Sequence, residues 1–441
     1  MKPNRNSIGA LFLKTALILL VLGLIFGALA SVIYIVPEFL KNNFGLTALR
    51  PLHVSSVVFW ILLAATGSIY LALENITPKQ SSTLLQKLHL IFWWMALAGI
   101  FYSYFTKNFG GREYWEYPSV YALLIGIAWV LFLILFIQKV RTMRPWPVYI
   151  WMWMTGIVYF LFIFIENYLW VIPWFREIFV KDMVIQWKAA GSIVGAYNML
   201  VYGVAFYLME RISKQSVPSY NKWAFALFFL SFFNMLFNWG HHLYLVPAKP
   251  YIHYIGYAVS MTEWVFFIKI LWNWHKQVTE AETYYHYFPY RFLLASNFWL
   301  FFNLTLALFM SIPAINLYMH GTHFITAHAM GTTIGINTMI LLAAAFEQLL
   351  PKQSSFSKGS KRTFWVIQLS LLLFLVFLLL MGIHKSIWFF QDPQPPFSEM
   401  MEKMKCWSAG FMISGITLAI SVVLMVTLFF RKKFAQGNPN H

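Results

Sequence analysis

Long apolar runs follow one another along this sequence, and they constrain its fold more than any other feature. Several of them exceed 18 residues and carry few charges, which is the length that crosses a lipid bilayer as a helix. Because 60% of the residues are hydrophobic and only 11% are charged, the composition does not fit a soluble domain. We therefore expect an all-α fold, an integral membrane bundle forming a single transmembrane domain over residues 1–441.

About twelve membrane-spanning helices are expected from these runs. Their limits are 9–36, 51–74, 86–106, 118–139, 147–170, 182–210, 222–243, 250–273, 291–313, 321–350, 363–384 and 405–430. The first run is too long for a signal peptide and lacks a small-residue cleavage site after it, so it is expected to be a retained span. The single cysteine, Cys406, excludes an intrachain disulfide, a cysteine-rich zinc site and a covalently attached c-type haem.

The charged residues predict how the chain is oriented. The net charge of +17 does not indicate nucleic-acid binding, because the basic residues lie in short loops between the spans. When the loops are numbered alternately, one side carries about half as many lysines and arginines as the other. The positive-inside rule then places both termini in the cytoplasm of a multi-pass protein of the cell (inner) membrane, surrounded by lipid. An even number of spans agrees with this.

The motif with the most chemical content opens the run 321–350. It reads His-Gly-Thr-His-Phe-Ile-Thr-Ala-His-Ala-Met over residues 320–330. Residues two apart on a helix point about 200° away from each other, so His328 and Met330 are expected on opposite faces. Imidazole and thioether are both common axial ligands of haem iron. This helix is therefore predicted to hold two haems, one on each side.

Other polar residues fall at the same predicted depth, in the outer half of the membrane. They are His53, Asn198, His241, His242 and Glu263, which come from four different spans. A single histidine in a membrane helix is more often a hydrogen-bonding group inside the bundle than a metal ligand. Ionisable residues within the membrane are costly, however, and a shared layer of them favours a functional site.

Two of these spans carry a predicted metal site. His241 and His242 are neighbours, and they can meet one metal only where a helix ends or is distorted, as Gly240 allows. Two histidines and a carboxylate form the facial set typical of non-haem iron, so Glu263 completes the set. Iron is preferred, with copper as the alternative. The competing interpretation is a pair of solvated loop histidines.

The outer loop Gly-Gly-Arg-Glu-Tyr-Trp-Glu-Tyr-Pro, 110–118, contains two further candidates. Arg112 is expected to pair with haem propionates, and Glu113 to help hold a hard cation such as calcium between them. The alternative is an ordinary interfacial loop with an aromatic belt.

With these motifs in place, the chain resembles subunit I of the haem–copper oxidase superfamily, and within it the nitric oxide reductase large subunit. The resemblance covers nearly the whole length. It implies that His53 ligates a low-spin haem b and that His328 ligates a high-spin haem of the b3 type. It also implies that His241, His242 and Glu263 hold the non-haem metal. Glu263 favours the reductase branch, because oxygen reductases do not generally use a glutamate there.

The first departure from the family pattern is Met330, which stands where a second histidine is usual. Sulfur ligation would keep a six-coordinate low-spin haem with a raised reduction potential; the alternative is that Met330 only packs. His323 lies two turns before Met330 on the same face and is a substitute ligand. His323 and His320 both match the family motif, so both are assigned to the cofactor-binding residues. Because the family keeps His323 in this motif, it is expected to have a role other than replacing Met330.

The second departure lies in the span 182–210. Asn198 replaces the family's third metal histidine, and Tyr202 replaces the glutamate four residues later. Asn198 is expected to bind weakly through its carbonyl oxygen or to hydrogen-bond a bound water. Tyr202 has the position of a redox tyrosine of some oxygen reductases, yet a core tyrosine is the favoured interpretation.

The resemblance predicts a respiratory-chain oxidoreductase that reduces two nitric oxide molecules to nitrous oxide. Its electrons would come from a cytochrome c-type subunit or from a quinol at the membrane surface. Three alternatives stay open: a divergent nitrogen-oxide enzyme such as a nitric oxide dismutase, a terminal oxygen reductase, and a non-catalytic haem subunit for electron transfer or sensing. A plain transporter would leave the layer of histidines unexplained.

Overall fold

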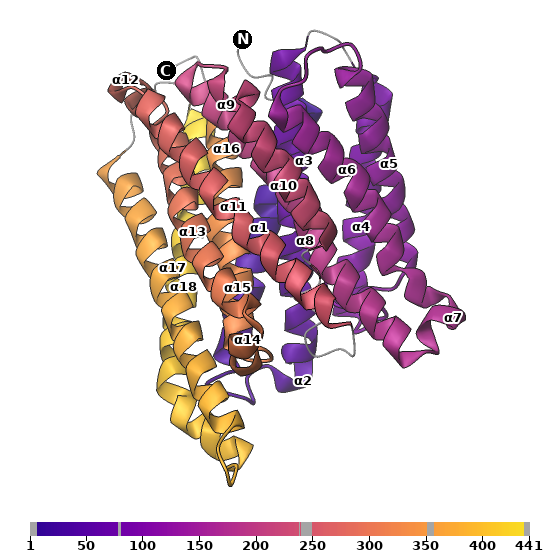
Figure 1. The fold of residues 1–441 in the computed structure, drawn as a ribbon, viewed down its shortest axis with the longest axis vertical. Coiled ribbons are helices and arrows are strands. Elements are labelled where there is room, and N and C mark those ends of the chain that lie inside the picture. Colours follow the sequence, from indigo (N-terminus) through magenta and orange to yellow (C-terminus); the bar gives the residue numbers. More distant parts are fainter. Residues whose placement is uncertain (1–6, 78–80, 238, 240–248, 351–356, 436–441) are drawn as a thin grey trace. The chain divides into compact units, whose positions relative to one another are not determined.

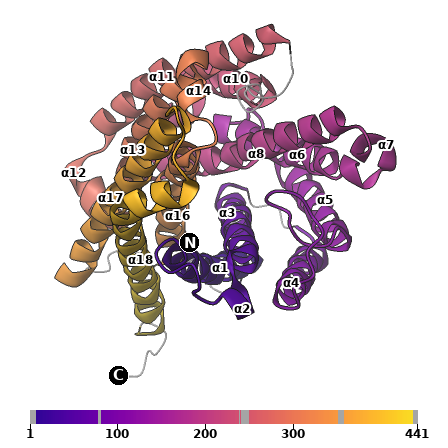
Figure 2. The same ribbon diagram turned by 90° about the horizontal axis from the view of Figure 1, so that it is seen from below.

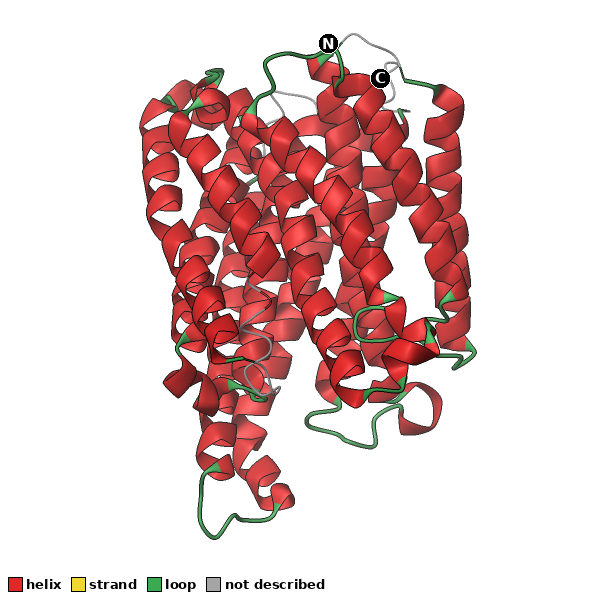
Figure 3. Ribbon diagram, turned by 45° about the vertical axis from the view of Figure 1, so that its right-hand side comes forward, coloured by secondary structure: helices red, strands yellow, loops and turns green. Residues whose placement is uncertain are grey.

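The computed structural model describes residues 7–77, 81–237, 239, 249–350 and 357–435, and every regular element in this part of the chain is a helix (Figures 1 and 3). The long helices are α1 (Ile8–Val32), α3 (Leu46–Ile76), α4 (Thr83–Phe105), α5 (Val120–Val140), α6 (Val148–Asn167), α8 (Phe179–Ser213), α10 (Lys222–Phe237), α11 (Pro250–Gln277), α13 (Tyr287–Ser311), α17 (Lys358–Phe389) and α18 (Phe397–Ala435). One further long segment joins α15 (His323–Met330), the π-helical η3 (Gly331–Thr338) and α16 (Met339–Leu349). The short elements are α2 (Lys41–Phe44), η1 (Leu169–Val171), α7 (Pro173–Arg176), α9 (Val217–Tyr220), α12 (Glu280–Tyr285) and α14 (Pro313–Met319).

The helices agree with the spans predicted from hydropathy. Ten helical segments of the described chain are long and apolar enough to cross a membrane. The two other predicted spans correspond to α10 and α11. In lipid each backbone polar group must be satisfied within its own segment or a closed barrel, so a helical bundle is the expected outcome for such runs. The prediction of an all-α membrane bundle of about twelve helices is confirmed.

The chain forms two compact units whose borders fall inside helices instead of linkers. Unit 1 comprises Met1–Ala16, Ile61–Leu293 and Ile340–Gln348, and unit 2 comprises Leu17–Trp60, Leu294–Met339 and Leu349–His441. Within unit 1, α4 lies beside α5 and α6 beside α8, and within unit 2, α17 and α18 form a hairpin (Figures 1 and 2). A single domain over 1–441 stays a prediction.

Close packing between α6 and α8 fixes the helix that carries Asn198 and Tyr202. A Cβ atom on Gly156 would lie 3.0 Å from the Ala196 carbonyl oxygen and 2.8 Å from Leu200 Cδ2, so glycine at this position lets α8 approach closely. Trp153 Nε1 donates a hydrogen bond to the Leu200 carbonyl at 3.2 Å. Since lipid offers no hydrophobic drive for helices to associate, small residues and interhelical hydrogen bonds of this kind are what join membrane helices.

Candidate functional site

His53 is oriented by the backbone of α1. Its Nδ1 lies 2.7 Å from the carbonyl oxygen of Gly23. A carbonyl oxygen only accepts, so Nδ1 carries the ring proton and Nε2 keeps its lone pair. Metal-binding histidines commonly donate their other ring N–H to a backbone carbonyl in this way. His53 is therefore held in the tautomer that an iron ligand needs.

Two glycines one turn apart allow this contact. A Cβ atom on Gly23 would lie 2.9 Å from Val57 Cγ2, and one on Gly27 would lie 2.7 Å from His53 Nδ1. Residues four apart share one face of a helix, so this face of α1 forms a cradle for the imidazole. Any larger side chain at Gly27 would displace the ring. The cradle is the observation that makes His53 fit a haem ligand.

His328 and Met330 lie within the α-helical part of their segment, α15. They therefore point to opposite sides of that helix, as predicted from their spacing. The His328 ring lies beside the backbone of Asn303 on α13, and its Nδ1 atom is buried. Asn303 Nδ2 also donates to Thr332 Oγ1 at 2.6 Å, which fixes the turn immediately after His328.

A hydrogen bond shows which face of α3 turns toward η3. Trp60 Nε1 donates to Thr338 Oγ1 at 3.0 Å. His53 precedes Trp60 by seven residues and shares its face of the helix, since seven residues complete about two turns. Both α3 and α15–η3 run away from the end of unit 2 that holds α2 and α14 (Figure 1). Met330 precedes Thr338 by eight residues, so His53 and Met330 lie at a similar number of residues from this hydrogen bond along their helices.

The sequence predicted a regular helix over 321–350, whereas residues 331–338 are π-helical. Two contacts explain the wider turns. A Cβ atom on Gly331 would lie 2.5 Å from Asn303 Oδ1, and one on Gly335 would lie 2.7 Å from Trp299 Cβ, so α13 presses against this segment. The hydroxyl of Thr338 donates to the carbonyl of Thr333, five residues earlier, at 2.8 Å. π-Helical turns often occur at functional sites.

Of the two other histidines of the motif, His320 directly follows α14 and His323 is the first residue of α15. Burial lowers the pKa of His320 below its ordinary value, so this ring is neutral near pH 7. The ring of His323 meets that of Tyr34 edge-on, with centroids 6.2 Å apart, and it lies beside the backbone of Met381. Lys385 Nζ donates to the Gly321 carbonyl at 2.8 Å, which ties α17 to the same turn. The cofactor-binding roles of both histidines stay predictions.

In unit 1, Arg112 has a protein partner that its sequence neighbourhood did not predict. Its NH2 group lies 2.9 Å from both carboxylate oxygens of Asp182, at the start of α8. The guanidinium also lies 5.1 Å from the centre of the Trp170 ring. The ion pair does not exclude a second acceptor, because a guanidinium has five N–H donors. The pairing of Arg112 with propionates and the calcium role of Glu113 stay predictions.

Glu263 lies near the middle of α11 and is 7% exposed. The side chains of Ser231 and Asn234 on α10 lie within reach of its carboxyl group, and the Tyr202 phenol is close enough to interact with it electrostatically. The Tyr202 ring also packs edge-on against Phe267, with centroids 5.8 Å apart. Helices α8, α10 and α11 thus place a buried carboxylate beside a phenol.

Asn198 lies one turn before Tyr202 on α8 and is half-buried. His241 and His242 fall outside the described residues, so their metal-binding role stays a prediction. Within residues 7–237, 249–350 and 357–435, gaps apart, no group of three or more histidine, cysteine, aspartate or glutamate side chains could hold a metal ion.

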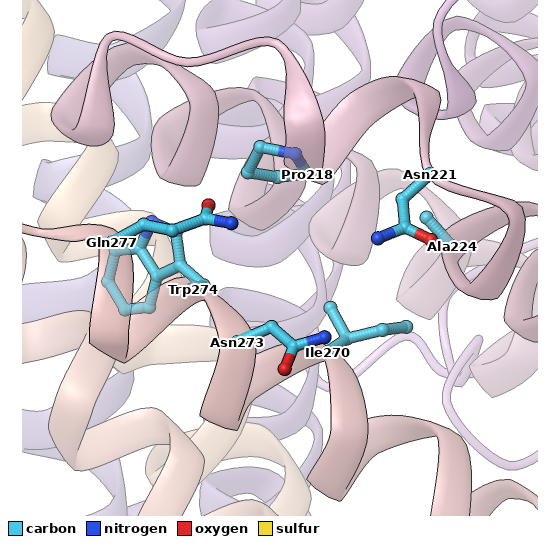
Figure 4. Close-up of a pocket in the computed structure, with 7 residues that line it drawn as sticks. All are labelled: Pro218, Asn221, Ala224, Ile270, Asn273, Trp274 and Gln277. Carbon is cyan, nitrogen blue, oxygen red and sulfur yellow. The ribbon is translucent and has the colours of Figure 1, made fainter.

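A small pocket lies away from these residues, between α9, α10 and the end of α11 (Figure 4). Asn221, Asn273 and Gln277 contribute amides to its lining, and Trp274 forms one wall. The space admits about one water molecule, which is far too little for a haem or a quinol headgroup.

Comparisons with known sequences give matches over most of the chain. The family model described as "Cytochrome C and Quinol oxidase polypeptide I" matches residues 7–417. A nitric oxide reductase subunit of Stutzerimonas stutzeri is 22% identical over 426 residues, which covers 89% of this chain and 87% of that protein. Cytochrome c oxidase subunit 1 of Rhodobacter capsulatus is 24% identical over 326 residues, covering 68% of this chain but only 58% of the oxidase subunit.

A solved structure gives the same fold. The cryo-electron microscopy structure of a haem–copper terminal oxidase dimer aligns with a TM-score of 0.72 at 12% sequence identity. The alignment covers 97% of this chain and 84% of the chain in that structure. At this identity the match concerns the path of the helices alone.

Proposed function

The chain belongs to subunit I of the haem–copper oxidase superfamily, and from that premise we propose that it is a membrane nitric oxide reductase. Members of this family hold haems and a second metal, take electrons from cytochrome c or a quinol, and act on small gaseous substrates. The proposed reaction joins two nitric oxide molecules, two electrons and two protons into nitrous oxide and water.

One observation carries the choice of nitric oxide over oxygen: the buried Glu263 carboxylate in the middle of α11. A carboxylate at this depth is costly and needs a function or a partner. Ser231, Asn234 and Tyr202 surround it with polar groups that can hydrogen-bond either its charged or its protonated form. The match to the reductase relative over 89% of the chain supports the same choice.

The residues of unit 2 fit the haem-binding roles proposed for them. His53 presents a free Nε2 because its Nδ1 donates to Gly23, and Met330 occupies the opposite face of α15 from His328. When bound, the two haem irons and the non-haem metal supply one-electron transfer and a site at which the gas is reduced. The contacts of Asn303 and Trp60 hold the helices that carry these residues in register.

The protein residues at the gas site have three proposed tasks. Glu263 would hold a proton on a carboxyl oxygen or, when charged, would join His241 and His242 in holding the non-haem metal. The Tyr202 phenol faces that carboxylate as a hydrogen-bond donor and keeps its proton, and Asn198 orients a water with its amide. Holding two reactants in the right orientation is itself a large part of such catalysis. The electron donor is proposed to be a cytochrome c-type subunit or a quinol.

A second candidate is a terminal oxygen reductase, which the closeness of the Tyr202 phenol to Glu263 favours. The replacement of two family histidines by Asn198 and Met330 equally suits a divergent nitrogen-oxide enzyme such as a nitric oxide dismutase. A non-catalytic haem subunit would bind the haems and lack the second metal.

Metal and haem analysis of the purified protein tests the proposal, with spectra before and after nitric oxide or carbon monoxide. We expect two b-type haems and one non-haem iron, and consumption of nitric oxide faster than of oxygen. One haem with no additional metal would contradict the proposed reaction, and a preference for oxygen would favour the second candidate.

His328→Ala tests the haem assignment directly. We expect it to remove the haem that binds carbon monoxide while the low-spin band is retained, since His53 and Met330 are unchanged. The measurement is the reduced-minus-oxidised spectrum with and without carbon monoxide. Loss of both bands in a well-folded variant would count against the assignment.

A further inference from the structure

A buried ionic cluster lies in unit 1 at the end that holds α9 and α12 (Figure 1). The Glu347 carboxylate on α16 accepts from two side chains. Arg211 Nε lies 2.7 Å from Oε1, and His286 Nδ1 lies 2.6 Å from Oε2. The side chains of Glu347 and His286 are 3% and 1% exposed. The proposed function does not use this cluster.

The geometry determines which nitrogen of His286 carries the proton. Arg211 stays charged, and it keeps Glu347 ionised as an acceptor on both oxygens. Nδ1 of His286 must then be the donor, which leaves a lone pair on Nε2 of the neutral ring. Nε2 is buried and has no hydrogen-bond partner among the described residues. A buried acceptor without a partner is costly, so it calls for an explanation.

A proton can bind to the free lone pair of Nε2. It would convert the ring to an imidazolium, which the carboxylate of Glu347 stabilises through the existing contact with Nδ1. The same pairing of a carboxylate with a histidine supports general bases in hydrolytic enzymes. The cluster therefore has a group that can take up a proton without rearranging its other hydrogen bonds.

Polar and aromatic groups on several helices surround the cluster. On α8, Arg211 NH1 donates to the Tyr207 hydroxyl at 3.3 Å, and Asn75 of α3 donates to the same hydroxyl at 3.4 Å. The Tyr285 ring meets His286 edge-on at 4.8 Å, and Lys214 Nζ lies 6.0 Å from the centre of that tyrosine ring. The neighbouring packing of Phe288 on Phe346 is apolar.

The cluster lies one side chain below the protein surface. The Arg211 side chain is 26% exposed, and Tyr285 is 38% exposed. In the other direction, Gln348, next to Glu347, donates to the Ser68 carbonyl of α3 at 3.0 Å, so polar groups continue into the unit. The positive-inside rule predicts that this end faces the cytoplasm.

We propose that the Glu347–His286 pair is a proton-uptake site of this enzyme, at which Nε2 of His286 accepts a proton from water on the predicted cytoplasmic side and later releases it inward. The inference rests on the proposed function, because reduction of nitric oxide consumes one proton for each electron. Glu347 and Arg211 are unchanged in the step. His286 becomes an imidazolium when the proton arrives and returns to the neutral ring when it leaves.

His286→Asn tests this role with little change in shape. The asparagine amide can replace Nδ1–H as a donor to Glu347, but it cannot bind a proton. The matched control is His275→Asn, the same substitution at an exposed histidine of the same end, on α11. Each variant is purified with its haems, and turnover of nitric oxide is measured from about pH 6 to about pH 9 with an artificial electron donor.

We expect His286→Asn to keep normal haem spectra, to lose turnover by about tenfold or more, and to lose the pH dependence of the remaining rate. His275→Asn should behave as the wild type. Normal turnover and an unchanged pH profile in His286→Asn would overturn the proposal while leaving the proposed function intact. Absence of gas turnover in the wild type would instead overturn the proposed function and this inference with it.

A measurement on the wild type covers the case in which His286→Asn fails to assemble. The enzyme is reconstituted in vesicles, and an impermeant pH indicator reports proton uptake on each side during turnover. Uptake from the side of α9 and α12 supports the proposal. Uptake only from the opposite side, where the loop 107–118 lies in the predicted topology, overturns it.

Discussion

Gly27 decides the position of His53 although it contributes no side chain. Gly27→Ala would place a Cβ atom 2.7 Å from His53 Nδ1 and 2.8 Å from its Cε1. The imidazole must then move away, which breaks its hydrogen bond to Gly23 and removes the preferred tautomer. We expect the low-spin haem band to be weakened or lost, while the haem that binds carbon monoxide is retained.

Gly126→Ala is the control for this substitution, because no atom lies within 4 Å of the position that its Cβ would take on α5. Visible spectra of both purified variants give the comparison. An unchanged low-spin band in Gly27→Ala would show that His53 does not hold a haem, since a ring displaced by an overpacked neighbour cannot keep its ligand geometry.

Met330 sets the electronic character of the low-spin haem if its sulfur is an axial ligand. Thioether ligation stabilises reduced iron relative to imidazole ligation, so Met330→His should lower the reduction potential of that haem. A spectroscopic redox titration measures the change, with the high-spin haem on His328 as the internal reference. A low-spin potential identical to that of the wild type would mean that Met330 only packs.

At the scale of elements, η3 is held between α3 and α13 by a few side chains. Thr338 Oγ1 accepts from Trp60 Nε1 and donates to the Thr333 carbonyl. Thr338→Val keeps the shape and leaves the buried indole N–H without an acceptor, which should cost about 1–3 kcal/mol. We expect lower thermal stability of the haem-bound protein and a shifted low-spin spectrum.

Thr305→Val gives the matched control for Thr338→Val. Thr305 is exposed on α13, and its hydroxyl donates to the Phe301 carbonyl of its own helix, at 2.8 Å. Its replacement should leave stability and spectra unchanged. Equal effects of the two substitutions would mean that the contact between α3 and η3 does not matter for the haem.

The sequence was sufficient to predict the helices but not their local distortions. Apolar length predicted the helices, because only a helix satisfies its own backbone in lipid. The opposite directions of His328 and Met330 followed from α-helical geometry alone. The π-helical turns of η3 could not be predicted, since they depend on Asn303 and Trp299, which approach from another helix.

The partners of buried charged side chains could not be predicted from the sequence either. Arg112 pairs with Asp182, 70 residues away, and His286 pairs with Glu347, 61 residues away. Such pairs are chosen by tertiary packing, and no local pattern marks them. One usable signal was present: Glu347 is a carboxylate at the end of an apolar run, and a carboxylate in that position needs a partner.

At the scale of the whole molecule, the predicted topology determines which ends of the helices meet which compartment. The start of α18 carries Glu399, Glu402, Lys403 and Lys405, whose side chains are 49%, 74%, 57% and 57% exposed. Charged groups this exposed do not lie against lipid hydrocarbon. The first turns of α18 must therefore project into water, on the side predicted to face away from the cytoplasm.

Cys406 follows directly after these charged residues, so its accessibility to a reagent reports on which side of the membrane α18 begins. It is the single cysteine of the chain, and it is exposed. A membrane-impermeant maleimide added to intact cells should label it, and Cys406→Ser should abolish labelling without changing the haem spectrum. Labelling only after the membrane is permeabilised would mean that the orientation is opposite to the predicted one. The Arg211–Glu347–His286 cluster would then face the outer compartment, and proton uptake through it would draw on that side, because all of these ends are fixed by the same alternation of spans.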